Sequence, residues 1–289
     1  MLNSKRALGA VFSLVFWGVL CSARAAQANP RVFPFTYTVD TMPKGELELE
    51  QYVDYIPVRV QNVLGSTGTL SWYGSTDFQT ELEYGLTSKL ELGLYVTFAP
   101  TLEYGYNGPT SFVGNGLKER LKYRFADAGE WPVDVGVYGE LVEDQRELEI
   151  EAKILLERRI GPVRIAANLT GEHENYFTCN ICSTPGVRQT SSQQDWVLNP
   201  SAGVSVEATP AIQPGVESFL YAEYTNPSAT PRPFGLGPHL YVGPTLLSQF
   251  GRLWWNVGAY ARVTDTAHQL QPQDTFGNFW VRSVIGYEL

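Results

Sequence analysis

The sequence has little basic charge, only three histidines and a single long apolar run. Its 289 residues include 21 lysines and arginines against 30 aspartates and glutamates, which gives a net charge of −9. Because nucleic-acid binding needs a basic surface, we expect no nucleic-acid partner. Helical membrane proteins need several apolar runs of about 20 residues, so this class is excluded as well. Hydrophobic residues make up 44% of the chain, which is too many for a disordered protein.

The one long apolar run predicts a secretory signal. It covers residues 7–20, follows a Lys-Arg pair and precedes an Ala-x-Ala cleavage motif that ends at Ala28. The run is too short for a membrane anchor, and Leu20 before Cys21 does not fit a lipoprotein signal. We therefore expect residues 1–28 to be a signal peptide and residues 29–289 to form one domain.

In the rest of the chain, apolar and polar residues alternate, and helical periodicity is almost absent. In residues 89–98, the four residues Leu90, Leu92, Leu94 and Val96 fall on one face, and polar residues fall on the other. About twelve segments show this pattern, at residues 45–56, 69–86, 88–99, 113–127, 131–143, 146–160, 162–174, 194–209, 214–226, 236–248, 251–264 and 276–289. Each segment is a candidate strand with one apolar face.

The lengths of the connections also alternate. They are short after the even-numbered segments, as at Gly161-Pro162, and mostly longer after the odd-numbered ones, as at residues 174–193. Outer-membrane barrels combine short periplasmic turns with long outer loops in this way. Since hydrocarbon cannot satisfy a free strand edge, the sheet must close and turn its apolar face toward lipid. We predict an all-β protein, a transmembrane antiparallel up-and-down β-barrel of about 12 strands in the bacterial outer membrane.

A few residues fit this pattern poorly. Glu119 and Gln51 fall on the apolar face of their segments, and Pro200 and Pro244 lie inside predicted strands. Local β-bulges or shifted strand boundaries would account for all four.

Three stretches resemble a known family of barrels. They are MPKGELELEQY at residues 42–52, FQTELEYGLTSKLELGLYVTF at residues 78–98 and GLKERLKYRF at residues 116–125. All three are similar to outer-membrane transporters related to the phenol-degradation meta-pathway barrel proteins. The resemblance implies passive transport, including transport of hydrophobic or aromatic solutes, and transfers no site residues. The chain departs from the usual barrel pattern because it ends in Leu289, where Phe or Trp is common as an assembly signal.

The polar faces of the predicted strands carry many charged residues. Acidic residues flank a basic strand on both sides, which favours cross-strand ion pairs over free pore charges. The alternative interpretation is a charged channel wall that selects solutes by electrostatics. The candidate pore-lining residues are Glu81, Glu83, Glu91, Lys118, Arg120, Lys122, Arg124, Asp134, Glu140, Glu149, Glu151, Arg164, Arg252, Arg262 and Arg282.

Cys179 and Cys182 form a C-x-x-C motif in the longest predicted loop. An oxidising compartment favours a local disulfide between them. His173 lies nearby in the sequence, but the number of ligands is too small for a metal site. We expect no metal and no cofactor.

We predict that the protein is a channel for passive passage of small solutes and is not an enzyme. Its expected partners are outer-membrane lipid, a small-molecule solute and the barrel assembly machinery. One alternative is a barrel hydrolase that acts on lipid, for which Ser248 and His239 are the nearest candidates, although no nucleophile motif surrounds them. The other alternative is a closed structural barrel.

Overall fold

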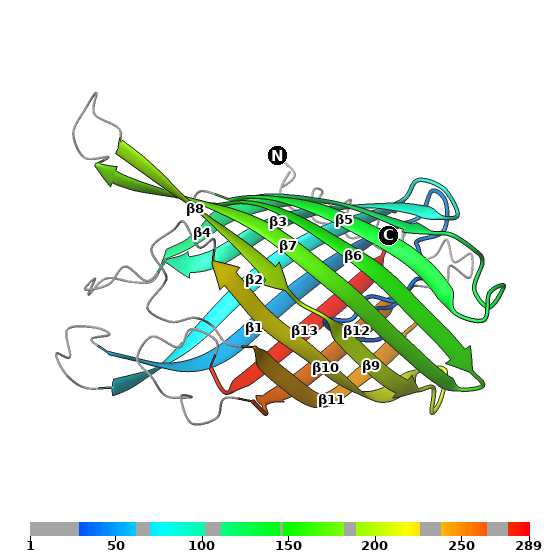
Figure 1. Ribbon diagram of the computed structural model, residues 1–289. Helices are drawn as coiled ribbons and strands as arrows, with labels where there is room; N and C mark the ends of the chain where they lie inside the picture. Colours follow the sequence, from blue (N-terminus) through cyan, green and yellow to red (C-terminus); the bar gives the residue numbers. More distant parts are fainter. Residues whose placement is uncertain are drawn as a thin grey trace, which may run out of the picture.

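The protein forms a closed antiparallel β-barrel of twelve strands. The computed structural model describes residues 29–61, 70–101, 111–144, 147–181, 189–225, 238–264 and 277–289. Within these ranges it contains only strands, turns and coil (Figure 1). The strand segments are β1 Leu47–Gln61, β2 Leu70–Gly85, β3 Leu90–Thr101, β4 Ser111–Arg124, β5 Asp134–Asp144, β6 Glu147–Ile160, β7 Val163–Ile181, β8 Gln189–Leu198, β9 Ser201–Val206, β10 Ile212–Thr225, β11 His239–Phe250, β12 Leu253–Arg262 and β13 Phe279–Glu288.

The thirteen segments fill twelve positions in the barrel. β8 and β9 both lie between β7 and β10, so together they form one interrupted strand. β13 pairs with β1, and β10 pairs with β11, which closes the sheet without a free edge. The predicted fold class and strand number are therefore confirmed. The described residues include no helix that is long and apolar enough to cross a membrane.

The two faces of the wall differ in the way that the alternation predicts. Leu94, Ile150 and Leu169 point outward and keep 45%, 55% and 54% of their surface exposed. Their strand neighbours Tyr95 and Glu151 point inward and are buried. An apolar outer face and a polar inner face suit a barrel that lies in lipid.

One end of the barrel carries short turns and is called the turn end below. β6 and β7 are joined at residues 161–162, and β11 and β12 at residues 251–252. Gly161 and Gly251 adopt φ angles of +59° and +67° there, which favour glycine. The turn between β4 and β5 covers residues 125–133 and is longer than predicted, because β4 ends earlier and β5 begins later than the pattern suggested.

The four poorly fitting residues have different explanations. Pro200, which was predicted inside a strand, lies in the break between β8 and β9. Pro244 stays inside β11, but the ladder to β12 lacks its pairs at Gly243 and Pro244. Proline has no N–H to donate, so it interrupts the ladder locally without shifting the register.

Glu119 and Gln51 do lie on the outer face, so a bulge does not move them inside. The register of β4 against β3 shifts between Thr97 and Phe98, but Glu119 remains exposed opposite Leu94. Gln51 is half-buried and accepts a hydrogen bond of 2.7 Å from the hydroxyl of Thr80 on β2. A polar partner on the neighbouring strand therefore compensates for its position.

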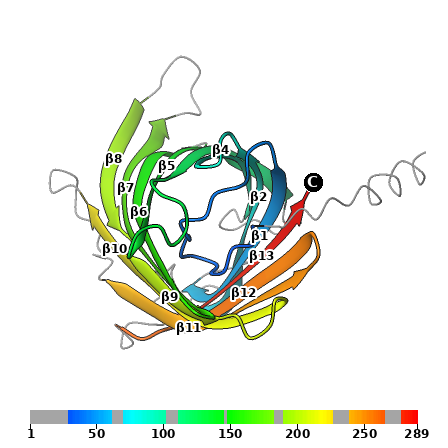
Figure 2. The ribbon, with the colours of Figure 1, turned by 90° about the vertical axis from the view of Figure 1, so that its right-hand side faces the viewer.

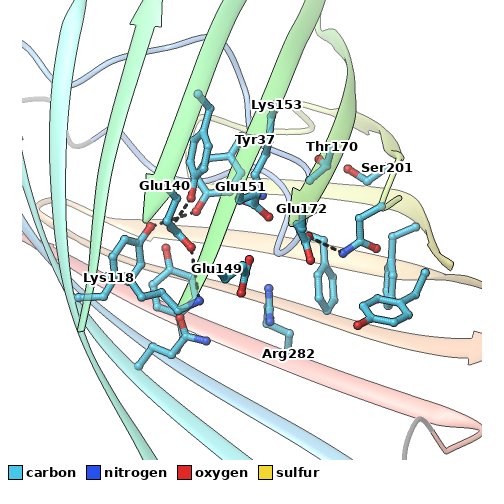
Figure 3. Close-up of a pocket in the computed structure, with 18 of the residues that line it drawn as sticks. Tyr37, Lys118, Glu140, Glu149, Glu151, Lys153, Thr170, Glu172, Ser201 and Arg282 are labelled. Atoms are coloured by element: carbon cyan, nitrogen blue, oxygen red, sulfur yellow. Dashed lines mark hydrogen bonds and ion pairs between the residues drawn. The ribbon is translucent and has the colours of Figure 1, made fainter. Parts of the chain in front are cut away.

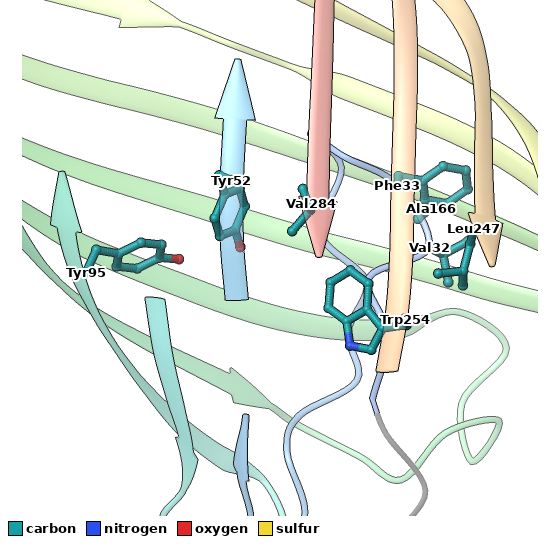
Figure 4. Close-up of a cluster of buried hydrophobic side chains, with 8 residues drawn as sticks. All are labelled: Val32, Phe33, Tyr52, Tyr95, Ala166, Leu247, Trp254 and Val284. Carbon is teal, nitrogen blue, oxygen red and sulfur yellow. The ribbon is translucent and has the colours of Figure 1, made fainter. Parts of the chain in front are cut away.

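The main feature that the sequence did not predict is a segment inside the barrel. Residues 31–42, here called the plug segment, pass through the lumen before the chain enters β1 (Figure 2). Phe33 and Met42 are fully buried. Val32 and Phe33 belong to a hydrophobic cluster with wall residues such as Trp254 and Leu247 (Figure 4). The wall side chains of a twelve-strand barrel do not fill its interior. The plug segment packs into the remaining space and so gives the barrel a core.

Candidate functional site

Side chains of the wall hold the plug segment by its backbone. Glu217 on β10 accepts hydrogen bonds from the amides of Phe35 and Thr36, at 3.1 and 2.5 Å. Asn168 on β7 bonds to both the amide and the carbonyl of Tyr37, at 2.6 and 2.9 Å. Because the plug segment pairs with no strand, these side chains satisfy backbone groups that would otherwise be buried without partners.

Two further carboxylates continue this pattern toward the turn end. Glu157 on β6 accepts a bond from the amide of Val39 at 2.9 Å, and Glu91 on β3 accepts one from the amide of Met42 at 2.6 Å. Asp40 pairs with both Arg159 and Arg164; its oxygen lies 3.3 Å from Arg164. The plug segment is thus fixed by wall residues around the barrel.

A glycine in the wall makes room for the plug segment. A Cβ on Gly203 of β9 would lie 2.6 Å from two ring atoms of Phe33. We therefore predict that Gly203→Ala displaces Phe33 and lowers the stability of the barrel by about 1–3 kcal/mol, as overpacking of a core does. Urea unfolding followed by tryptophan fluorescence measures the change.

The matched control is Gly139→Ala on β5, where an added Cβ would have no atom within 4 Å. Its unfolding midpoint should equal that of the wild type. If Gly203→Ala unfolds at the same urea concentration as this control, Phe33 does not pack against the wall as described.

A cavity of about 230 Å³, here called the lumen cavity, lies inside the barrel beside the plug segment (Figure 3). Phe35 and Tyr37 of the plug segment contribute to its lining, and the barrel wall supplies the rest. One side of the wall is acidic, with Glu140 on β5, Glu149 and Glu151 on β6, and Glu172 on β7.

Two lysines partly neutralise the acidic side. Lys118 on β4 lies 3.4 Å from Glu140, and Lys153 on β6 lies 2.7 Å from Glu151. Oxygens of Glu149, Glu151 and Glu172 lie within 4.8 Å of one another. The four carboxylates exceed the two lysines, so this side of the lumen cavity attracts positive charge.

The other side of the lumen cavity is aromatic. Phe35 stacks on Phe219 with ring centroids 4.1 Å apart, and Trp280 meets Phe35 edge-on at 5.4 Å. Arg282 lies 3.8 Å above the ring of Phe35 and forms a bidentate ion pair with Asp54, at 2.7 and 2.6 Å. Because Asp54 occupies its guanidinium, Arg282 adds little free positive charge to the cavity.

A second charged group lies closer to the turn end. Nη2 of Arg120 lies 2.8, 2.6 and 2.7 Å from oxygens of Glu81, Glu83 and Glu91, and Lys122 lies 3.0 Å from Glu91. Arg120 and Glu81 are fully buried. These five residues, here called the Arg120 cluster, form a network of ion pairs that joins β2, β3 and β4.

The remaining predicted pore-lining residues lie outside these two groups. Arg124 at the end of β4 lies 3.3 Å from Asp127, and Asp134 at the start of β5 accepts a bond from the amide of Gly129; both partners belong to the turn between these strands. Arg252 also lies in a turn, whereas Arg164 contacts Asp40. Arg262 is buried near the opposite end of the barrel.

Sequence reasoning missed several residues of the interior. Three of them, Arg31, Phe35 and Tyr37, belong to the plug segment. This segment lacks the alternation of a strand, so the sequence did not place it inside the barrel. Glu48 and Glu50 have the inward parity of β1 and are fully buried, so the alternation itself could have placed them.

The structure does not bring together the residues of the alternative functions. Ser248 and His239 lie nine positions apart on β11 and on opposite faces, so about 30 Å of strand separates them.

The side chain of Cys179 and all of Cys182 fall outside the described residues, so the predicted disulfide stays a prediction. His173 stacks on Trp196, with ring centroids 4.4 Å apart, on the outer face of the wall.

Comparisons with known proteins agree with this barrel. A model of a protein family of unknown function matches residues 25–274. No curated protein matches the sequence closely enough to count as a relative.

Two solved structures share the fold. The COG4313 outer membrane channel from Pseudomonas putida F1 is 10% identical, with a TM-score of 0.56 over 87% of this chain and 98% of that chain. The NanC porin is 7% identical, with a TM-score of 0.50 over 84% of this chain and 100% of that chain. At these identities the likeness shows the fold alone, a closed antiparallel β-barrel. The narrower relation to the phenol-degradation barrels remains a prediction.

Proposed function

The chain belongs to the DUF6662 family, whose function is unknown, and we propose that it is an outer-membrane channel for passive passage of small polar solutes, preferentially cations. The apolar outer face supports a position in lipid, and the barrel architecture is that of outer-membrane channels. The acidic side of the lumen cavity supports the preference for cations, because its four carboxylates face only two lysines.

The aromatic side of the lumen cavity supports a second class of solute. An aromatic or hydrophobic solute could pack against the rings of Phe35, Phe219 and Trp280. The resemblance to the phenol-degradation barrels implies the same class of solute. We place this class second, because the same cavity also contains carboxylates and lysines. A hydrocarbon would displace water from these charged groups and could not form the hydrogen bonds that the water had made.

The proposal is tested by ion selectivity in planar bilayers. Under a KCl gradient, the reversal potential of the wild type should show a preference for K⁺. The triple variant E149Q/E151Q/E172Q should lose most of this preference, because the carboxylates that attract cations are gone while Lys118 and Lys153 remain.

Glu119→Gln is the control for position, because it removes one carboxylate from the outer face of the same barrel. Its reversal potential should equal that of the wild type. A folded wild-type protein that produces no conductance at all would contradict the channel and favour the closed structural barrel.

A further inference from the structure

Three buried glutamates gather on the inner wall beside the Arg120 cluster. Glu48 lies directly opposite Glu83 across the β1–β2 pair, and Glu50 follows two residues later on β1. One oxygen from each of the three lies within 4.8 Å of the others. Glu48 and Glu50 are fully buried, and Glu83 is 3% exposed. Like charges opposite one another on neighbouring strands destabilise a sheet unless something neutralises them.

The hydrogen bonds of these glutamates leave oxygens free on the inside. Trp254 donates to Oε1 of Glu48 at 2.7 Å, while Oε2 of Glu48 is buried and has no partner outside the three glutamates among the described residues. The hydroxyl of Tyr52 contacts Oε2 of Glu50, while Oε1 of Glu50 is likewise buried and has no described partner outside the three glutamates. Arg120 binds Oε1 of Glu83 at 2.6 Å.

These glutamates share one feature with carboxylates that bind metal ions. A ligating carboxylate is commonly held by a hydrogen bond to one oxygen while its other oxygen faces the metal. A buried carboxylate oxygen without any partner is costly, because it has lost water and gained nothing in return.

The charges of the region also do not balance. Five carboxylates contact or face only three cations, and Glu288, which is buried directly opposite Glu48 on β13, adds a further carboxylate, so negative charge is in excess. The five carboxylates are Glu48, Glu50, Glu81, Glu83 and Glu91, and the cations are Arg31, Arg120 and Lys122.

We propose that Glu48, Glu50 and Glu83 bind one divalent cation, with Ca²⁺ preferred over Mg²⁺. A divalent ion reduces this excess of negative charge and gives the free oxygens of Glu48 and Glu50 a partner. Ca²⁺ accepts several carboxylates in flexible geometry, whereas Mg²⁺ demands a strict octahedron and keeps its waters. The site would tie β1 to β2 next to the plug segment, whose Arg31 lies 4.0 Å from Glu50. It does not depend on whether solutes pass the barrel.

The experiment is a calcium titration of the folded full-length protein in detergent. The protein is treated with EDTA, dialysed, and titrated with CaCl₂ and separately with MgCl₂ by calorimetry. We expect one saturable Ca²⁺ site per chain, weaker binding of Mg²⁺, and a higher unfolding temperature with CaCl₂ than with EDTA, because an ion that binds only the folded state stabilises it.

Variants locate the site. E48Q/E50Q should lose the calorimetric signal, whereas E149Q/E172Q, which alters the acidic group of the lumen cavity instead, should keep it. Trp254→Phe removes the donor that orients Glu48 and should weaken Ca²⁺ binding several-fold. This variant also provides the test if E48Q/E50Q does not fold.

Two results would overturn the proposal. In the first, the wild type binds neither ion, which would mean that protons shared between the carboxylates neutralise the cluster instead. In the second, Ca²⁺ binding persists in folded E48Q/E50Q. Both outcomes are independent of the bilayer experiment, since a barrel that binds calcium need not conduct, and a channel need not bind calcium.

Discussion

Deletion of residues 31–42 should raise the single-channel conductance several-fold. The plug segment crosses the lumen (Figure 2), and its residues Phe33 and Met42 are fully buried. A barrel of twelve strands leaves inner space that its own side chains do not fill, so removing the segment opens that space to water. The acceptors that now bind the segment, such as Glu217 and Glu157, would line the widened path.

The control for this deletion is Asp40→Asn. It removes the ion pairs of Asp40 with Arg159 and Arg164 at the turn end but leaves the buried part of the plug segment in place. Its conductance should stay close to that of the wild type. A folded deletion variant with unchanged conductance would show that the segment is not the narrowest part of the path.

Arg120→Met should destabilise the barrel by about 3–5 kcal/mol, the usual cost of breaking a buried ion pair by removing one partner. The substitution keeps much of the side-chain volume but leaves Glu81, Glu83 and Glu91 facing one another inside the wall. We expect a lower midpoint for urea unfolding in lipid vesicles and a smaller folded fraction after refolding.

Two variants show whether charge causes this loss. Arg124→Gln removes an equal charge from the same strand, but its ion pair joins Asp127, which is 68% exposed, and should change stability by less than about 1 kcal/mol. Adding Glu81→Gln and Glu83→Gln to Arg120→Met should restore part of the stability. If the triple variant is as unstable as Arg120→Met alone, lost packing and not unpaired charge is the cause.

The wall of the barrel could be predicted because its signal is local. Each strand shows its own alternation, and the short turns follow from pairs such as Gly161-Pro162, so the strand number did not depend on contacts between distant residues. At two places the prediction had the right elements but the wrong boundaries. The strand predicted at residues 194–209 is interrupted at Pro200, and the turn between β4 and β5 is longer than predicted.

The interior was harder to predict, because its contacts join residues that are distant in the sequence. Residues 31–42 show no pattern that pairs them with a strand, and their amides bind Glu217, Asn168 and Glu157 on three different strands. The basic residues of β4 were placed on the inner face, but alternation does not show that Arg120 reaches across Gly93 to β2. A Cβ on Gly93 would lie 2.5 Å from Nε of Arg120, so the glycine leaves room for that side chain.

The central claim is that the apolar face of the wall meets lipid while the polar face meets water in the lumen. Spin labels test it directly in reconstituted vesicles, with one label at Leu94→Cys on the outer face and another at Gln79→Cys beside the lumen cavity, after Cys179 and Cys182 are changed to serine. We predict that oxygen dissolved in the bilayer reaches the label at position 94 and that a water-soluble nickel complex reaches the label at position 79. A label at position 94 that neither reagent reaches would mean that Leu94 lies in a dry protein core, and this result would contradict the barrel in its membrane.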